Sequence, residues 1–344
     1  MQVLLDLLKF ALQEGLVLLV TPIYILFLYT IYKFRRHAHF NSSFFALIFI
    51  TGIADMSSLL LYMVGSRMTT YRIPFLMRLY EAGGRWLANF FFGGHIYLQH
   101  VNYVSVFLIA YNRYTALAAP PAKHAKLWTK SRMTLAVVLQ LLFPMTYCIP
   151  QIIVCPYDFV VANGSLVQGP NSRNKAPTCL ILSYSILTLT STVTVITVTI
   201  LYAFSWRTVW RHSHKKVHPS TKSLATRGEE IRERRNRKAQ ANLAFTGFLI
   251  SLSLTTIVLH RLFGIAFRKY INPAIYYPIG GLLVNIFDLL NPVLVLSTSK
   301  KTRDYFWITL KLTARRHVEE SEIDALDPVR AIRNVHKNRL KSKL

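Results

Sequence analysis

Seven stretches of this chain are long and apolar enough to cross a lipid bilayer, and they limit its fold more than any other feature. A spanning helix needs about 20 mostly apolar residues, because lipid offers the backbone no hydrogen-bond partners. The connections between the stretches are short, so we expect an all-α bundle of seven transmembrane helices in one membrane domain, 16–299, with no separate catalytic domain. The predicted spans are 16–34, 44–66, 86–112, 133–154, 179–206, 241–266 and 274–299.

The formal charge of +26 is distributed unevenly along the chain. In a soluble protein such a charge would suggest a nucleic-acid partner. Here, roughly three quarters of the 41 lysines and arginines fall in alternate connections and in the C-terminal tail, on one side of the predicted bundle. By the positive-inside rule this side is cytosolic. We therefore expect an extracellular N-terminus (1–15), a cytosolic C-terminus, and the lipid bilayer rather than nucleic acid as partner.

The segment after the last predicted span is both basic and aromatic. Lysines at its start precede Tyr305, Phe306 and Trp307. This mixture is typical of a short helix in the membrane interface, which we expect within 300–318. The tail, 319–344, mixes charges with little apolar material, and we expect it to be disordered.

The second outer connection carries two features of an extracellular loop. Cys155 and Cys179 flank it, and in an oxidising compartment we expect them to form a disulfide that closes it. The alternative is that both, together with Cys148, are free and buried. Between them, Asn163-Gly164-Ser165 is an acceptor sequence for N-linked glycosylation at Asn163.

Two acidic residues, Asp55 and Asp288, lie deep inside predicted spans. They share their depth with Asn102, roughly 17 Å from the cytosolic ends of their helices at about 1.5 Å per residue. Asn291 follows on the same face of the last span as Asp288. Two carboxylates in apolar surroundings must share a proton, bind a cation, or depend on amides and water. The layer is therefore either a switch that holds and releases a sodium ion or a proton, or a static hydrogen-bonded core. No other metal and no cofactor is expected.

Polar and aromatic residues also gather near the outer ends of four spans. Such a mixture, opening outward, is typical of a small-molecule pocket between helices. A single histidine in a helix bundle is more often a satisfied core residue, so this prediction depends on the whole cluster. Its members are His95, Gln99, Asn102, Tyr184, His260, Tyr276 and Tyr277.

Three short motifs resemble the signatures of rhodopsin-like G-protein-coupled receptors. Asn112-Arg113-Tyr114 at the inner end of the third span resembles Asp/Glu-Arg-Tyr, with Asn in place of the acid. Asn291-Pro292-Val293-Leu294-Val295 resembles Asn-Pro-x-x-Tyr without its tyrosine, and Asp55 matches the aspartate of the second helix. The Cys-Trp-x-Pro pattern of the sixth helix is missing, as is the usual cysteine at the top of the third.

These departures fit one branch of such receptors. The runs Phe40-Asn41-Ser42-Ser43-Phe44-Phe45 and Asn112-Arg113-Tyr114-Thr115-Ala116, with the later Leu127-Trp128, are similar to the nematode serpentine chemoreceptors. The resemblance covers about 16–312 and points to the Srg superfamily, class V or class gamma. It implies a plasma-membrane receptor for an odorant or pheromone, a small-molecule ligand, in the cilium of a chemosensory neuron.

The resemblance further implies that the inner face couples to a heterotrimeric G protein. In rhodopsin-like receptors the arginine matched by Arg113 meets the G protein or locks the inactive state. Arg235 and Lys238 belong to a basic segment that leads into the sixth span. This segment either faces the G protein or binds anionic lipid headgroups.

Other classes of membrane protein fit the sequence less well. An intramembrane aspartyl protease also needs two aspartates at one depth, but the surroundings of Asp55 and Asp288 lack its Tyr-Asp and Gly-x-Gly-Asp patterns. A retinal protein needs a lysine in the last span, and 274–299 has none. A small seven-helix transporter is the remaining alternative, although no symmetry between the first and last helices is evident.

Overall fold

The computed structural model describes residues 14–70, 74–162, 165–170, 176–214, 224–267, 270 and 273–314. Nearly all of this part is helical. In chain order the elements are α2 (Leu16–Lys33), α3 (Ser43–Tyr62), η2 (Met63–Arg67, a π-helical turn), α4 (Met68–Thr70), α5 (Pro74–Ala118), α6 (Pro121–Leu127), α7 (Lys130–Val154), β1 (Tyr157–Ala162), β2 (Ser165–Pro170), α8 (Ala176–His214), α9 (Leu224–Ala266), α10 (Pro273–Thr298) and α11 (Lys300–Ala314).

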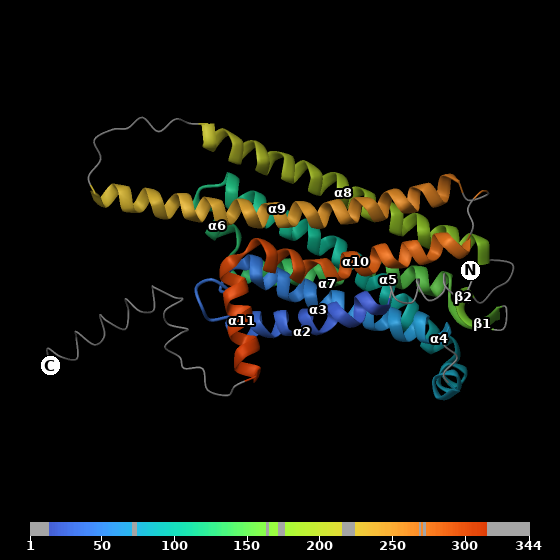
Figure 1. Ribbon diagram of the computed structural model, residues 1–344. Helices are drawn as coiled ribbons and strands as arrows, with labels where there is room; N and C mark the ends of the chain where they lie inside the picture. Colours follow the sequence, from blue (N-terminus) through green and yellow to red (C-terminus); the bar gives the residue numbers. More distant parts are fainter. Residues whose placement is uncertain are drawn as a thin grey trace.

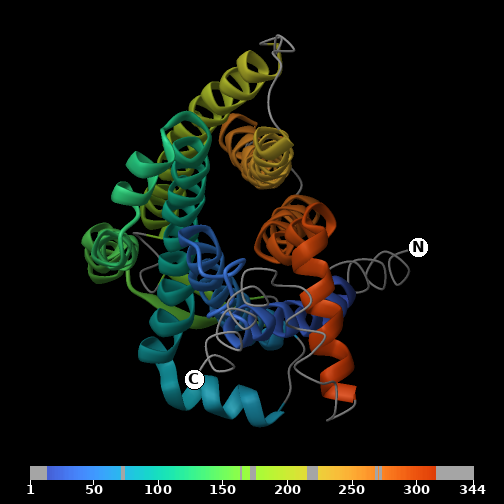
Figure 2. The ribbon, with the colours of Figure 1, turned by 90° about the vertical axis from the view of Figure 1, so that its left-hand side faces the viewer.

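Seven long helices of the described part run along one another as a bundle: α2, α3, α5, α7, α8, α9 and α10 (Figure 1). The short helix α11 lies across one end of this bundle, as the view from that end also shows (Figure 2). The β1–β2 hairpin lies at the opposite end (Figure 1). We refer to these as the α11 end and the hairpin end. The seven-helix fold predicted from the sequence is confirmed.

Six of the described helices are long and apolar enough to cross a membrane on their own: Leu16–Lys33, Ser43–Arg67, Lys130–Val154, Ile181–Thr208, Phe245–Ala266 and Ile279–Thr298. Helix α5, which contains the third predicted span, is more polar. It packs against α3, α7, α8 and α9, so its polar side chains are shielded from lipid by other helices. This central position explains how a helix that is too polar to face lipid can belong to the bundle.

The outward surfaces of the bundle are apolar. Helix α7, for example, exposes Leu135, Leu139, Phe143 and Ile153. A soluble protein rarely leaves such a continuous apolar surface in water, whereas lipid tails are as apolar as these side chains. The exposed surface therefore suits a bilayer.

Helix α5 is kinked at Gly84, where φ is +48°. Glycine adopts this left-handed conformation at little cost because it lacks a Cβ atom. The short part of α5 before Gly84 turns away from the bundle at the hairpin end (Figure 1). Residues 85–118 then run the length of the bundle as its central helix.

The hairpin occupies the connection between α7 and α8. Its strands pair antiparallel, from Tyr157 opposite Pro170 to Ala162 opposite Ser165. A disulfide between Cys155 and Cys179, with Cα atoms 5.4 Å apart, ties its base to α8, while Cys148 is free and buried. No strands are predicted here from the sequence. Asn163-Gly164 after a run rich in aromatic and β-branched residues is, however, a hairpin signal as well as part of a glycosylation site.

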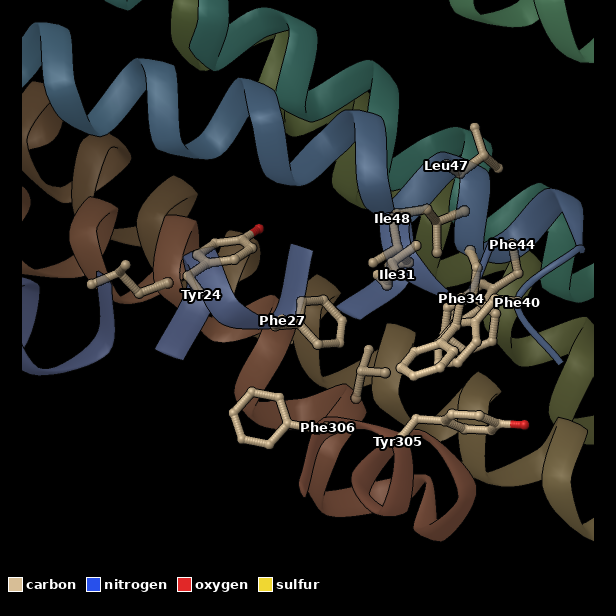
Figure 3. Packing of buried hydrophobic residues seen from close by; sticks show 14 of the residues in the cluster. Tyr24, Phe27, Ile31, Phe34, Phe40, Phe44, Leu47, Ile48, Tyr305 and Phe306 are labelled. Atoms are coloured by element: carbon tan, nitrogen blue, oxygen red, sulfur yellow. The ribbon is translucent and has the colours of Figure 1, made fainter. Parts of the chain in front are cut away.

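A cluster of aromatic residues fixes α11 to the bundle (Figure 3). The ring of Tyr305 is buried with its centroid 4.8 Å from that of Phe34 and 5.2 Å from that of Phe40. Beside it, His39 Nε2 and Thr302 Oγ1 are hydrogen bonded at 3.0 Å. On the other face of α11, Trp307 is exposed, as an interfacial helix requires. The predicted tail, 319–344, and Asn163 lie outside the described residues.

Candidate functional site

A cavity of about 350 Å³ lies between the helices at the hairpin end of the bundle. Its wall combines residues of α3, η2, α4, α5, β1, α8, α9 and α10. Much of this wall is apolar, with Phe91 and Ile96 from α5, Ile257 from α9 and Leu283 from α10. The volume lies within the range of sites that bind small molecules.

Among the described side chains of the hairpin, Tyr157 lines the cavity. Its ring lies against Phe92, with centroids 3.8 Å apart, and its hydroxyl is hydrogen bonded to Ser183 Oγ at 3.0 Å. The Asn89 side chain accepts from the Tyr157 backbone N–H at 2.8 Å and donates to its carbonyl at 3.2 Å. Together with the disulfide, these contacts make the hairpin a fixed wall of the cavity.

A chain of hydrogen bonds crosses the cavity from α3 to α9. Gln99 Nε2 lies 2.9 Å from His95 Nε2, and because the amide nitrogen donates, this ring nitrogen accepts. His95 Nδ1 therefore carries the hydrogen and donates to Ser58, whose carbonyl oxygen is 3.2 Å away. Gln99 Oε1 accepts from Arg261 at 3.3 Å, and Tyr103 Oη accepts from Arg261 at 2.8 Å. The network fixes both the tautomer of His95 and the position of Arg261.

Four of the predicted pocket residues line the cavity. They are His95 and Gln99 of α5, His260 of α9 and Tyr276 of α10. The rings of His260 and Tyr276 are stacked with centroids 4.2 Å apart, and the Tyr276 hydroxyl donates to the His260 carbonyl at 3.0 Å.

The three other predicted pocket residues are not among the described residues of the cavity wall. Asn102 lies deeper in the bundle, where its amide group faces Asp288 instead of the cavity. The side chains of Tyr184 and Tyr277 lie outside the described residues.

Arg261 is the residue of the cavity that the sequence analysis missed. It follows His260 directly and is only 8% exposed. Its position falls inside the predicted span 241–266. A signal was available, since an ionisable residue within a spanning segment usually marks a functional site.

The predicted polar layer lies deeper, around Asp55 and Asp288, which are each 2% exposed. Asn291 Nδ2 donates to Asp55 Oδ2 at 2.8 Å, and the Tyr24 hydroxyl donates to the same oxygen. Asn102 Nδ2 lies 3.5 Å from Asp288 Oδ1. Tyr24 of α2 was not predicted. Both carboxylates therefore receive neutral donors.

Several oxygen atoms of this layer have no hydrogen-bond partner among the described residues. These are the amide oxygens of Asn102, Asn285 and Asn291 and the hydroxyl of Thr51, all of them buried. Within the described ranges, no three His, Cys, Asp or Glu side chains are grouped as for a metal ion. Any cation held here would depend on carboxylate and amide oxygens.

At the α11 end, the side chain of Arg113 on α5 is buried against α3. Its guanidinium lies 3.7 Å from the centroid of the Phe44 ring and donates to Asn112 Oδ1 at 3.1 Å. Asn112 in turn donates to Ser43 Oγ at 2.7 Å. The asparagine that replaces the expected acid thus still contacts the arginine beside it. Arg235 and Lys238 belong to α9, but their side chains lie outside the described residues.

The fold and these sites define the class as a seven-helix membrane protein with a ligand-sized cavity at one end and a buried arginine at the other. The family model of the serpentine type 7TM GPCR chemoreceptor Srv matches residues 13–312, and the chain belongs to this family. The predicted membership of the serpentine chemoreceptors is confirmed. The protein is therefore a chemosensory membrane receptor, and its family is not an enzyme family. Curated proteins give no significant match.

Proposed function

We propose that this receptor binds an odorant or pheromone in the cavity and signals through a heterotrimeric G protein. In this proposal the hairpin end faces outward and the α11 end faces the cytosol of a chemosensory neuron, at the plasma membrane of its cilium. The orientation is supported by the lysines and arginines concentrated on the α11 side. The basic start of α9, with Arg235 and Lys238, contacts the G protein or the inner leaflet.

One observation carries the proposal: helix α5 both lines the cavity and bears Arg113. Gln99 in the cavity wall and Arg113 belong to one helix and lie roughly 21 Å apart along its axis at about 1.5 Å per residue. A ligand that binds one arrangement of α5, α9 and α10 more tightly shifts the population toward that arrangement. In the active arrangement Arg113 leaves Phe44 and Asn112 and meets the G protein.

The polar layer lies on this route, and we assign it the role of a switch. In the inactive arrangement the layer holds a sodium ion or a proton, and in the active arrangement it releases it. The residues of the layer are Asp55, Asp288, Asn102 and Asn291. The amide oxygens of the layer that have no hydrogen-bond partner within the described ranges support this role, since hard cations prefer oxygen ligands.

Replacing Arg113 tests the coupling step. We expect Arg113→Ala to abolish G-protein activation while surface expression and ligand binding stay close to the wild type, because Arg113 lies far from the cavity. The measurement is a calcium or G-protein activation assay in cells that express the receptor, with surface labelling in parallel. Arg132→Ala is the matched control, since Arg132 is exposed at the start of α7. Normal signalling by Arg113→Ala would contradict the proposed coupling.

A further inference from the structure

The cavity wall contains a buried positive charge, Arg261, that forms no ion pair with an acidic side chain among the described residues. Arg261 is 8% exposed, and its described hydrogen bonds go to two neutral acceptors, Tyr103 Oη and Gln99 Oε1. Among the described residues, none that lines the cavity is an aspartate or a glutamate. A guanidinium carries five N–H donors, so these two bonds leave donors over.

The acidic residues nearest to this region are already engaged. Glu14 forms an ion pair with Arg67, with Oε1 2.6 Å from the guanidinium. Asp288 lies in the deeper layer, with Asn102 beside its carboxylate. It is near enough to Arg261 for the two charges to attract each other, but in the described part of the chain they form no ion pair. Burying an unpaired charge is costly, and an anion in the cavity would offset that cost.

From this arrangement we infer that the ligand of the cavity is an organic anion, a small molecule with a carboxylate and an apolar body. The inference rests on the proposed function. A planar guanidinium matches a carboxylate with two parallel hydrogen bonds. Gln99 and Tyr103 hold the guanidinium in place, and the apolar wall, with Phe91, Ile257 and Leu283, surrounds the rest of the molecule.

Matched amphiphiles test the inference on the purified receptor in nanodiscs of phosphatidylcholine. The probes are hexanoate, octanoate and decanoate, compared with the methyl ester, alcohol and amine of the same chain length. Binding is measured as the shift in melting temperature over a concentration series. We expect the acids to stabilise the wild type more than their neutral or cationic counterparts. If no acid binds, or if an alcohol or amine binds as tightly, the inference is overturned without any variant.

Arg261→Gln then removes the charge and keeps a hydrogen-bonding side chain. We expect it to weaken acid binding about tenfold or more while leaving the neutral analogues unchanged, and we expect Arg261→Lys to recover part of the preference. Arg85→Gln is the matched control, because it removes an exposed charge of α5 that does not line the cavity. Undiminished acid binding by a folded Arg261→Gln protein would overturn the inference.

The same compounds in a cellular G-protein assay separate this inference from the proposed function. Acids that bind through Arg261 but never signal would contradict the receptor mechanism and leave the anion site standing. Signalling by neutral or cationic compounds alone would support the receptor mechanism and overturn the anion site.

Discussion

Asp55 illustrates how single residues carry the proposed mechanism. Its carboxylate is buried and bonded by the hydroxyl of Tyr24 and the amide of Asn291. In the described part of the chain no cationic side chain forms an ion pair with it. Neutral donors stabilise a buried carboxylate less than a counter-ion does, so a proton or a sodium ion at this point would lower the free energy of the folded bundle.

Asp55→Asn tests this role of the layer. We expect the wild-type response to ligand to depend on sodium or on pH, and we expect the variant to lose that dependence, because a neutral amide needs no counter-ion. The measurement is a dose–response series in sodium and in choline buffers at two pH values. Asp304→Asn, the same change in α11, is the control. If the Asp55→Asn receptor folds and reaches the cell surface normally, and its response to ligand is unaltered, the layer is a static core and not a switch.

The candidate site was predictable from the sequence only in part, for a physical reason at the residue scale. Helical periodicity puts His95 and Gln99 on one face of a helix, and both line the cavity. The same periodicity includes Asn102, yet this residue faces Asp288. Periodicity gives the direction of a side chain but not the partner helix in that direction. The role of Tyr24 depends on such a partner and is not predictable from the sequence, whereas Arg261 carries a signal of its own as a charge inside the predicted span 241–266.

At the scale of elements, α11 and the first connection form one unit with a titratable group inside it. His39 bonds to Thr302 of α11, and its ring centroid lies 4.9 Å from those of Phe40 and Phe45. Burial, and to a lesser degree the charge of Lys301, lower the pKa of His39 from 6.5 to about 4. Between these two values the unfolded chain binds a proton that the folded chain does not, so stability falls as the pH falls.

His39→Asn should flatten that dependence. We expect the melting temperature of the wild type in detergent to fall more steeply from pH 7 to pH 5 than that of the variant, because only the wild type gains a proton on unfolding. Between pH 7 and pH 8 the two melting temperatures should differ by a constant amount, which serves as the internal control. Parallel curves over the whole range would show that His39 does not titrate in this way.

The elements differed in how far the sequence could predict them. Six helices follow from apolar runs alone, since lipid imposes a minimum length on each. Helix α5 extends from Pro74 to Ala118, beyond the predicted span 86–112. The prediction was too short because apolarity does not mark the residues at the two ends of this helix. The hairpin was not predicted because its Asn163-Gly164 signal also fits a glycosylation site, and its packing through Tyr157 is a tertiary contact.

At the scale of the whole molecule, the account depends on which end of the bundle faces the cell exterior. The hairpin lies at one end of the bundle and α11 at the other (Figure 1). The cavity and the disulfide belong to the hairpin end, since Tyr157 of β1 lines the cavity and Cys155 lies just before β1, whereas Arg113 lies near the opposite end of α5. A ligand from outside reaches the cavity only if the hairpin end faces outward, and the G protein reaches Arg113 only if the α11 end faces the cytosol. Both conditions are met by one orientation.

Antibody labelling of terminal tags on intact cells tests this orientation most directly. The account predicts that a tag before residue 1 is labelled on intact cells, and that a tag after residue 344 is labelled only once the membrane is permeabilised. Labelling of the C-terminal tag on intact cells would place the cavity in the cytosol and contradict the receptor mechanism.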